Sequence, residues 1–99
     1  MSEPIALSVE PGLRELVPGF LDNRRRDLEA LARAMESGDL AAVRGVGQNI
    51  RCFSRVLGVG ELTSLGEELE TAAEESARMR IAHLHAKLAD YLSRVRLAD

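Results

Sequence analysis

Three arginines and one glutamine form the pattern in this sequence best suited to chemistry: Arg44, Gln48, Arg51 and Arg55. They recur at steps of three or four residues, so a helix would gather them on one face within an arc of about 60°. No acidic residue lies between Asp39 and Glu61, so the stripe predicts a local positive patch on a chain of net charge −3. Guanidinium groups in such a patch attract phosphate groups or acidic protein surfaces, whereas a solvated helix face is the plainer interpretation.

Cys52, His83 and His85 are the other side chains with reactive atoms. Cys52 lies beside the arginines, whose charge makes a thiol more reactive, so it is either a redox-sensitive residue or an incidental small one. The two histidines are two positions apart, which is about 200° around a helix, so they cannot bind one metal ion together. No catalytic triad, phosphate-binding loop or carboxylate pair is present, so we expect neither an enzyme nor a cofactor.

Length and composition predict a single globular domain. The chain has 99 residues, of which 45% are hydrophobic and 29% charged. Its net negative charge disfavours a nucleic-acid-binding protein, which needs excess positive charge. The single cysteine fits a reducing compartment, and the acidic N-terminus lacks the apolar run of a signal peptide. No stretch approaches the roughly 20 apolar residues of a membrane span, so we expect a cytoplasmic protein without a membrane partner.

The pattern of apolar residues predicts an all-α fold. All three prolines fall within the first 18 residues, and no run has the alternation of a strand. Four amphipathic helices with short links predict an up-down antiparallel four-helix bundle over residues 11–99, after an N-terminal tail of residues 1–10. The predicted elements are a short extra N-terminal helix over 11–17 that bends at Pro18–Gly19, and four longer helices. The first of these runs from the bend to about residue 37, and the others span about 40–57, 61–76 and 79–97.

Local signals define the ends and faces of these helices. Gly38 suits the residue after a helix end and Asp39 suits the N-cap of the next helix. Within the second long helix, Gly47 falls on the core side, where close packing explains it, and Gly45 falls on the outer side. The arginine run 24–26 on the first long helix reads as solvated surface, with the glutamates of the third helix as its expected partners.

The segment 48–58 resembles the signature of histidine phosphotransfer (HPt) domains, which is His, two variable residues, Lys, Gly and a variable stretch ending in Leu-Gly. Residues 16–21, 35–40 and 65–70 are similar to the opening helix of that family, its turn into the active helix and its following helix. The resemblance spans about residues 10–97. It implies a four-helix HPt fold. It also implies that the protein binds a response-regulator receiver domain or a histidine kinase of a bacterial phosphorelay.

Three positions of the signature differ in this chain. Gln48 stands where the family has its phosphorylated histidine, Arg51 replaces Lys, and Cys52 replaces Gly, while Leu57 and Gly58 match. The lone pair of an amide nitrogen is delocalised into the carbonyl group, so Gln48 cannot attack phosphorus as a neutral imidazole does.

The resemblance therefore implies a docking module that does not accept phosphate. Its expected partner-binding residues are Arg44, Gln48, Arg51, Cys52, Arg55 and Gly58. Two alternatives stay open at this point: a structural or oligomerising bundle that has lost receiver binding, and an active phosphotransfer protein that uses His83 or His85.

Overall fold

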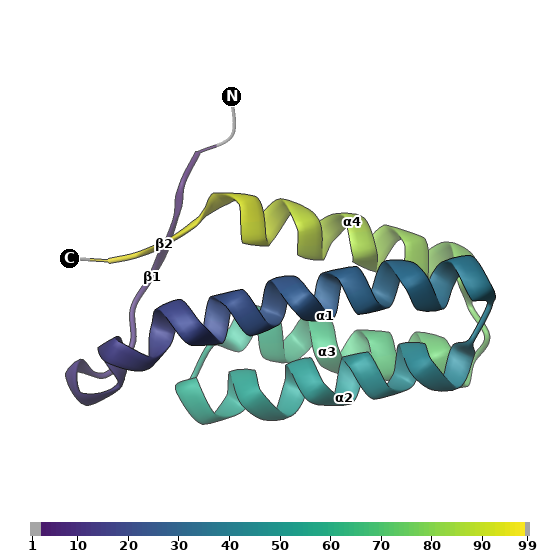
Figure 1. Cartoon of the computed structure of the whole chain (residues 1–99), viewed down its shortest axis with the longest axis horizontal. Coiled ribbons are helices and arrows are strands. Elements are labelled where there is room, and N and C mark those ends of the chain that lie inside the picture. The colour runs from purple at the N-terminus through teal and green to yellow at the C-terminus, as the bar shows by residue number, and fades with distance from the viewer. Residues whose placement is uncertain (1–2, 99) are drawn as a thin grey trace.

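Four α-helices lie side by side along the long axis of the molecule (Figure 1). The computed structural model describes residues 3–98, and its extents are 40 × 30 × 18 Å. The elements in chain order are β1 (Ile5–Leu7), the 3-10 helix η1 (Pro11–Leu16), α1 (Val17–Ser37), α2 (Leu40–Leu57), α3 (Gly60–Glu74), α4 (Arg78–Arg94) and β2 (Val95–Leu97). The prediction of a compact bundle of four helices is confirmed, and η1 occupies the place expected for the short N-terminal helix. The junction precedes the predicted bend at Pro18–Gly19, because both residues already lie in the first turn of α1.

The helix ends follow the local signals. Gly38 and Gly58 adopt left-handed backbone conformations with φ of 69° and 73°, which glycine reaches without the penalty of a Cβ atom. Asp39 caps α2, because its side-chain oxygen accepts a hydrogen bond of 3.0 Å from the amide of Ala42. Between α3 and α4 no glycine is available, and Ser76 takes the left-handed conformation with φ of 54°.

The inward faces of the helices form one hydrophobic core. Most of its members are aliphatic, as the composition requires, and Phe20 and Tyr91 join them. Leu31, Ile50, Leu62, Leu69 and Leu88 are completely buried. Burying such a side chain stabilises the fold by about 1.5–3 kcal/mol relative to leaving it exposed.

Two glycines bring the backbones of α2 and α3 into direct contact. A Cβ atom added to Gly66 would lie 2.5 Å from the amide nitrogen of Arg51 and 2.6 Å from the carbonyl oxygen of Gly47. A Cβ atom on Gly47 would lie 2.8 Å from the carbonyl oxygen of Gly66. The expectation that Gly47 serves close packing is confirmed, and Gly45 has nothing within 4 Å of its would-be Cβ atom.

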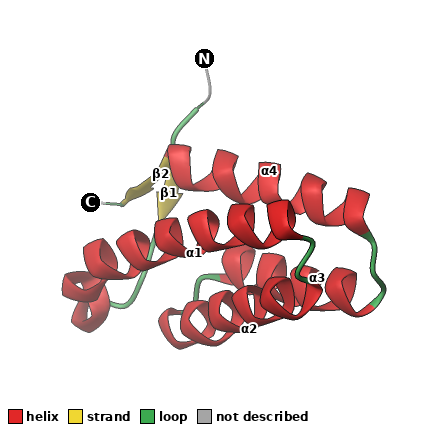
Figure 2. Ribbon diagram, turned by 45° about the vertical axis from the view of Figure 1, so that its right-hand side comes forward, coloured by secondary structure: helices red, strands yellow, loops and turns green. Residues whose placement is uncertain are grey.

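The two ends of the described chain form a short parallel strand pair that the sequence did not predict. Ile5, Ala6 and Leu7 pair with Val95, Arg96 and Leu97, and Figure 2 shows both strands (yellow) beside the end of α4. The predicted extension of the last helix to residue 97 is therefore wrong. Val95 is already extended, with φ of −69° and ψ of 137°, and its buried side chain joins the core together with Leu7.

Replacing Gly66 by Ala should destabilise the fold through the contact between α2 and α3. The added methyl group has only backbone atoms to displace, so we expect Gly66→Ala to lower the free energy of unfolding by about 1–3 kcal/mol. The matched control is Gly45→Ala, which fills open space on a helix and should raise the same quantity by about 0.5–1 kcal/mol. Urea denaturation followed by circular dichroism measures both, and shifts of the same sign would contradict this account of the contact.

Candidate functional site

The outward face of α2 carries a row of exposed, uncharged residues. This α2 ridge consists of Ala41, Gly45, Gln48, Cys52 and Val56, which recur at steps of three or four. Every one of these residues is exposed, and Val56 reaches 71% of its full accessibility. Gln48 lies at the centre of the ridge, so its amide is open to a partner. Leu57 ends the helix in the core, and Gly58 makes the exposed turn that follows.

The three arginines of the predicted stripe do not lie on this ridge. They line the contact between α2 and α3, where each pairs with a glutamate of α3. Nε of Arg44 lies 3.2 Å from Glu74, and Nη2 of Arg55 lies 3.0 Å from Glu67. The prediction of a local positive patch is therefore wrong, because the acidic helix α3 supplies one carboxylate for each of the three guanidinium groups. Glu67, Glu70 and Glu74 thus pair with arginines of α2, and Glu68 lies 3.5 Å from Arg80 of α4. Within residues 3–98, none of the α3 glutamates pairs with the run 24–26.

Arg51 is the least exposed of the three arginines. Its side chain is 25% exposed and donates a hydrogen bond from Nε to Oε1 of Glu70, while Nη2 lies 3.4 Å from Oε2. The hydrogen bond to Glu70 raises the pKa of Arg51 above its ordinary value. An acidic partner would have to compete with Glu70 for this guanidinium, whereas Arg44 and Arg55 form pairs that are more than half exposed. Exposed pairs of that kind contribute little stability and exchange readily.

The two histidines lie on α4, away from the α2 ridge. His83 is exposed and His85 is half-buried at the edge of the apolar face, and the free thiol of Cys52 is exposed on α2. Across residues 3–98, no three His, Cys, Asp or Glu side chains come together as a metal site. In the same part of the chain, none of the helices combines the length and apolarity needed to cross a bilayer.

A buried polar cluster joins α1 to the other side of α2. Arg24 is only 2% exposed, and its Nε lies 2.7 Å from Oδ2 of Asp27 in an ion pair that lacks the alignment of a hydrogen bond. Asp27 accepts a hydrogen bond of 2.8 Å from Nδ2 of Asn49, the neighbour of Gln48. The rings of Phe20 and Phe53 flank the guanidinium, with centroids 5.0 and 5.2 Å from Cζ of Arg24.

This cluster corrects the reading of the arginine run as solvated surface. Arg25 and Arg26 are exposed, but Arg24 faces the core. The sequence does contain a signal for it. The apolar positions of α1 are spaced at three or four residues except between Leu21 and Leu28, and Arg24 and Asp27 occupy the inward positions within that gap. Two opposite charges at a spacing of three can face the core as a pair.

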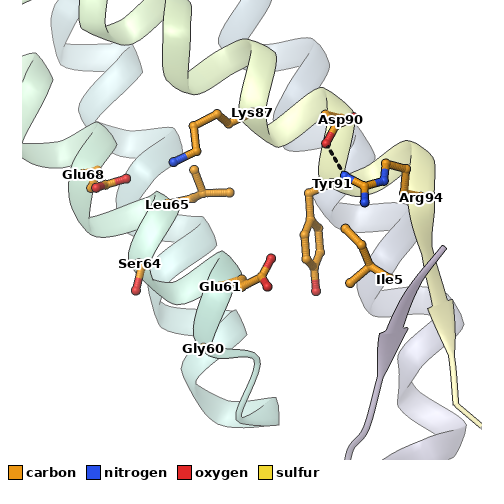
Figure 3. Close-up of a pocket in the computed structure, with 10 residues that line it drawn as sticks. All are labelled: Ile5, Gly60, Glu61, Ser64, Leu65, Glu68, Lys87, Asp90, Tyr91 and Arg94. Atoms are coloured by element: carbon orange, nitrogen blue, oxygen red, sulfur yellow. Dashed lines mark hydrogen bonds and ion pairs between the residues drawn. The ribbon is translucent and has the colours of Figure 1, made fainter. Parts of the chain in front are cut away.

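A cavity of about 580 Å³ forms a groove between α3 and α4 (Figure 3). Tyr91 forms part of its wall, and burial, followed by the charge of Glu61, raises the pKa of the Tyr91 hydroxyl. Asp90 and Arg94 form an ion pair of 2.8 Å in the same groove. Acidic and basic side chains alternate along it, so no single ligand charge is favoured there. No residue of α2 lines this groove, which separates it from the candidate site.

Burial of Asp27 should make the stability of the fold depend on pH. Burial raises the pKa of this carboxyl above 3.8, although Asn49 and Arg24 partly oppose the shift. The folded chain then binds the proton more tightly than the unfolded chain does. Consequently, protonation of Asp27 increases the free energy of unfolding as the pH falls through the raised pKa toward the unfolded value.

We expect the natural chain to gain unfolding free energy relative to Asp27→Asn as the pH falls from about 7 to about 4. Urea denaturation at several pH values measures it. Asp22→Asn is the matched control, because it removes an exposed carboxylate from the same helix. If the difference in unfolding free energy between the natural chain and Asp27→Asn has the same pH dependence as that for Asp22→Asn, burial does not raise the pKa of Asp27.

Comparisons of the chain with protein families, with curated proteins and with solved structures find no match.

Proposed function

We propose that this chain is an HPt-like signalling module of a bacterial phosphorelay that binds a receiver domain or a histidine kinase without accepting phosphate. In this proposal the four helices form an up-down antiparallel bundle like that of the HPt family, and the protein works in the cytoplasm. The docking surface is the α2 ridge around Gln48, bordered by Arg44, Arg51 and Arg55 and ended by Gly58. The exposure of Gln48 at the centre of an uncharged ridge is the observation that carries the proposal.

The composition of the α2 ridge supports docking of a protein. An interface buries charged side chains at a desolvation cost, and the cores of interfaces are accordingly depleted in charge. The ridge has no charged member, its residue Val56 keeps 71% of its accessibility, and the neighbouring Phe53 keeps 54%. The small side chains of Gly45 and Cys52 flank Gln48, so a partner can approach the helix closely. The ion pairs between α2 and α3 border the ridge as a polar rim.

The chemistry of Gln48 supports binding without transfer. A phosphoacceptor needs a nucleophilic lone pair, and a neutral imidazole nitrogen provides one near neutral pH. The amide of Gln48 can donate and accept hydrogen bonds, but its nitrogen is not nucleophilic. Such a module would occupy the surface that a true phosphotransfer partner uses, and would hold or compete for that partner.

The variant Gln48→His should accept a phosphoryl group, which the natural chain cannot do. We expect it to take up label from a ³²P-phosphorylated receiver domain of the same cell, as an acid-labile phosphohistidine, because the other features of the ridge are unchanged. The natural chain should stay unlabelled. Ala41→His is the matched control, since it places a histidine on the same ridge two turns earlier and should also stay unlabelled.

Two results would contradict the proposal. Label on the natural chain that disappears when His83 and His85 are replaced would assign active transfer to a displaced histidine. Failure of Gln48→His to accept label from every receiver domain tested would remove the basis for an HPt-like site and favour a structural bundle.

A charge placed on the α2 ridge should weaken docking. We expect Cys52→Glu to lower the affinity for a receiver or kinase captured by the natural chain at least about tenfold, which corresponds to about 1.4 kcal/mol, because the new carboxylate must be desolvated at the interface. Ala82→Glu makes the same change at an exposed position of α4 and should leave the affinity unchanged. Isothermal titration calorimetry measures both. Equal affinities for the two variants would favour the structural bundle.

A further inference from the structure

A groove of about 550 Å³ runs between α1 and α2, on the side of α2 that faces α1. We refer to it as the α1/α2 groove. Its apolar walls include Leu16, Phe20, Phe53 and Leu57, and its polar groups include Arg24 and Asn49. Binding sites for small molecules typically enclose about 300–1,000 Å³ and combine apolar walls with a few polar groups. The α1/α2 groove has both the size and the composition of such a site.

Arg24 lines this groove and carries a donor that nothing in the described chain satisfies. The residue is 2% exposed, and its Nη1 is buried without a hydrogen-bond partner. Asp27 is the one carboxylate paired with it, through Nε. A buried donor left unpaired costs about 1–3 kcal/mol, and more when the group is charged. An incoming anion that accepts from Nη1 would recover that energy.

Phe53 covers the guanidinium on the side of α2. Its ring lies over Arg24, yet 54% of the residue is exposed, so the ring can rotate toward solvent without leaving a core position. The ring of Phe20, which is buried, also lies against the guanidinium, with its centroid 5.0 Å from Cζ. One of the two rings beside the guanidinium is therefore held in the core, while the other belongs to an exposed side chain that can move.

The charges of the groove favour an anion. Arg24 and Arg26 oppose the single carboxylate of Asp27, and within residues 3–98 Arg26 forms no ion pair but donates to Oδ1 of Asn23 over 3.2 Å. The exposed Leu16 extends the apolar wall to the mouth of the groove. A ligand complementary to this arrangement carries a negative group at one end and an apolar body at the other.

We infer that the α1/α2 groove binds a small carboxylate with an aliphatic body, anchored by Arg24. The carboxylate accepts from Nη1 of Arg24 after the ring of Phe53 swings aside, and the aliphatic body lies against Leu16 and Phe20. Asp27 competes with the ligand's carboxylate for Arg24, because its own carboxylate already pairs with Nε of the same guanidinium. This site is separate from the docking proposed for Gln48, which does not line the groove.

Octanoate and 1-octanol test this inference on the full chain, because they share an aliphatic body and differ in charge. In ¹H–¹⁵N NMR titrations we expect octanoate to shift the amides of residues 16–27 and 49–57 saturably. We expect 1-octanol to bind at least about tenfold more weakly, since it lacks the charge-assisted hydrogen bond. Equal affinity for the two probes, or octanoate shifts confined to the groove between α3 and α4, would overturn the inference.

Three variants assign the anchor. Arg24→Met should raise the dissociation constant of octanoate at least about tenfold, and Arg25→Met should leave it unchanged, because Arg25 is exposed and pairs with Asp22. Asp27→Asn removes the competitor and should lower the dissociation constant about threefold or more. This last result would not follow from a purely structural cluster, and it keeps the test decisive if Arg24→Met fails to fold. Unchanged or weaker binding by Asp27→Asn would refute the role of Arg24 as an anion anchor.

Discussion

The direct contact between the backbones of α2 and α3 at Gly47 and Gly66 determines which surface of the molecule is open to a partner. No side chain fits between the two helices at that point, so the helices approach more closely than larger residues would permit. The approach fixes the rotation of α2 about its own axis. The side chains of Arg44, Arg51 and Arg55 then reach the glutamates of α3 along the edge of this contact, and the neighbouring Gln48 is exposed to solvent.

This rotation changes the electrostatic character of the candidate site. Arginines that would attract phosphate if they were free are matched by Glu67, Glu70 and Glu74, so long-range attraction of an anionic partner by this face is weak. Docking on the α2 ridge would depend on shape and on apolar contact with residues such as Val56. Arg51 differs in this respect from the lysine of the HPt signature, which the segment 48–58 resembles, because a planar guanidinium can hold the carboxylate of Glu70 through two nitrogens.

The side of α2 that faces α1 is held by polar side chains, whereas the side that faces α3 is held by the contact between glycines. Asn49 links α2 to Asp27, and Asp27 pairs with Arg24 inside the contact with α1. A buried pair of this kind adds little stability compared with well-packed apolar residues, and breaking it by removing one partner is costly. The cluster therefore orients α1 against α2 and leaves Nη1 of Arg24 with neither a hydrogen bond nor an ion pair among the described residues. Gly47 and Asn49, on the two sides of Gln48 in the sequence, are thus held by neighbouring helices, while Gln48 itself is exposed.

The sequence by itself determined the four helices, the turns at Gly38 and Gly58, the cap by Asp39 and the inward position of Gly47. These features depend on periodicity and on backbone preferences that act within a few residues. Only the tertiary structure decided which glutamates pair with Arg44, Arg51 and Arg55, that Arg24 is buried, and that residues 5–7 pair with residues 95–97. Each of these outcomes joins residues on different elements, or depends on which part of a helix another element covers. A periodic pattern gives the direction of a side chain around its own helix axis, but it does not identify the neighbour that the side chain meets.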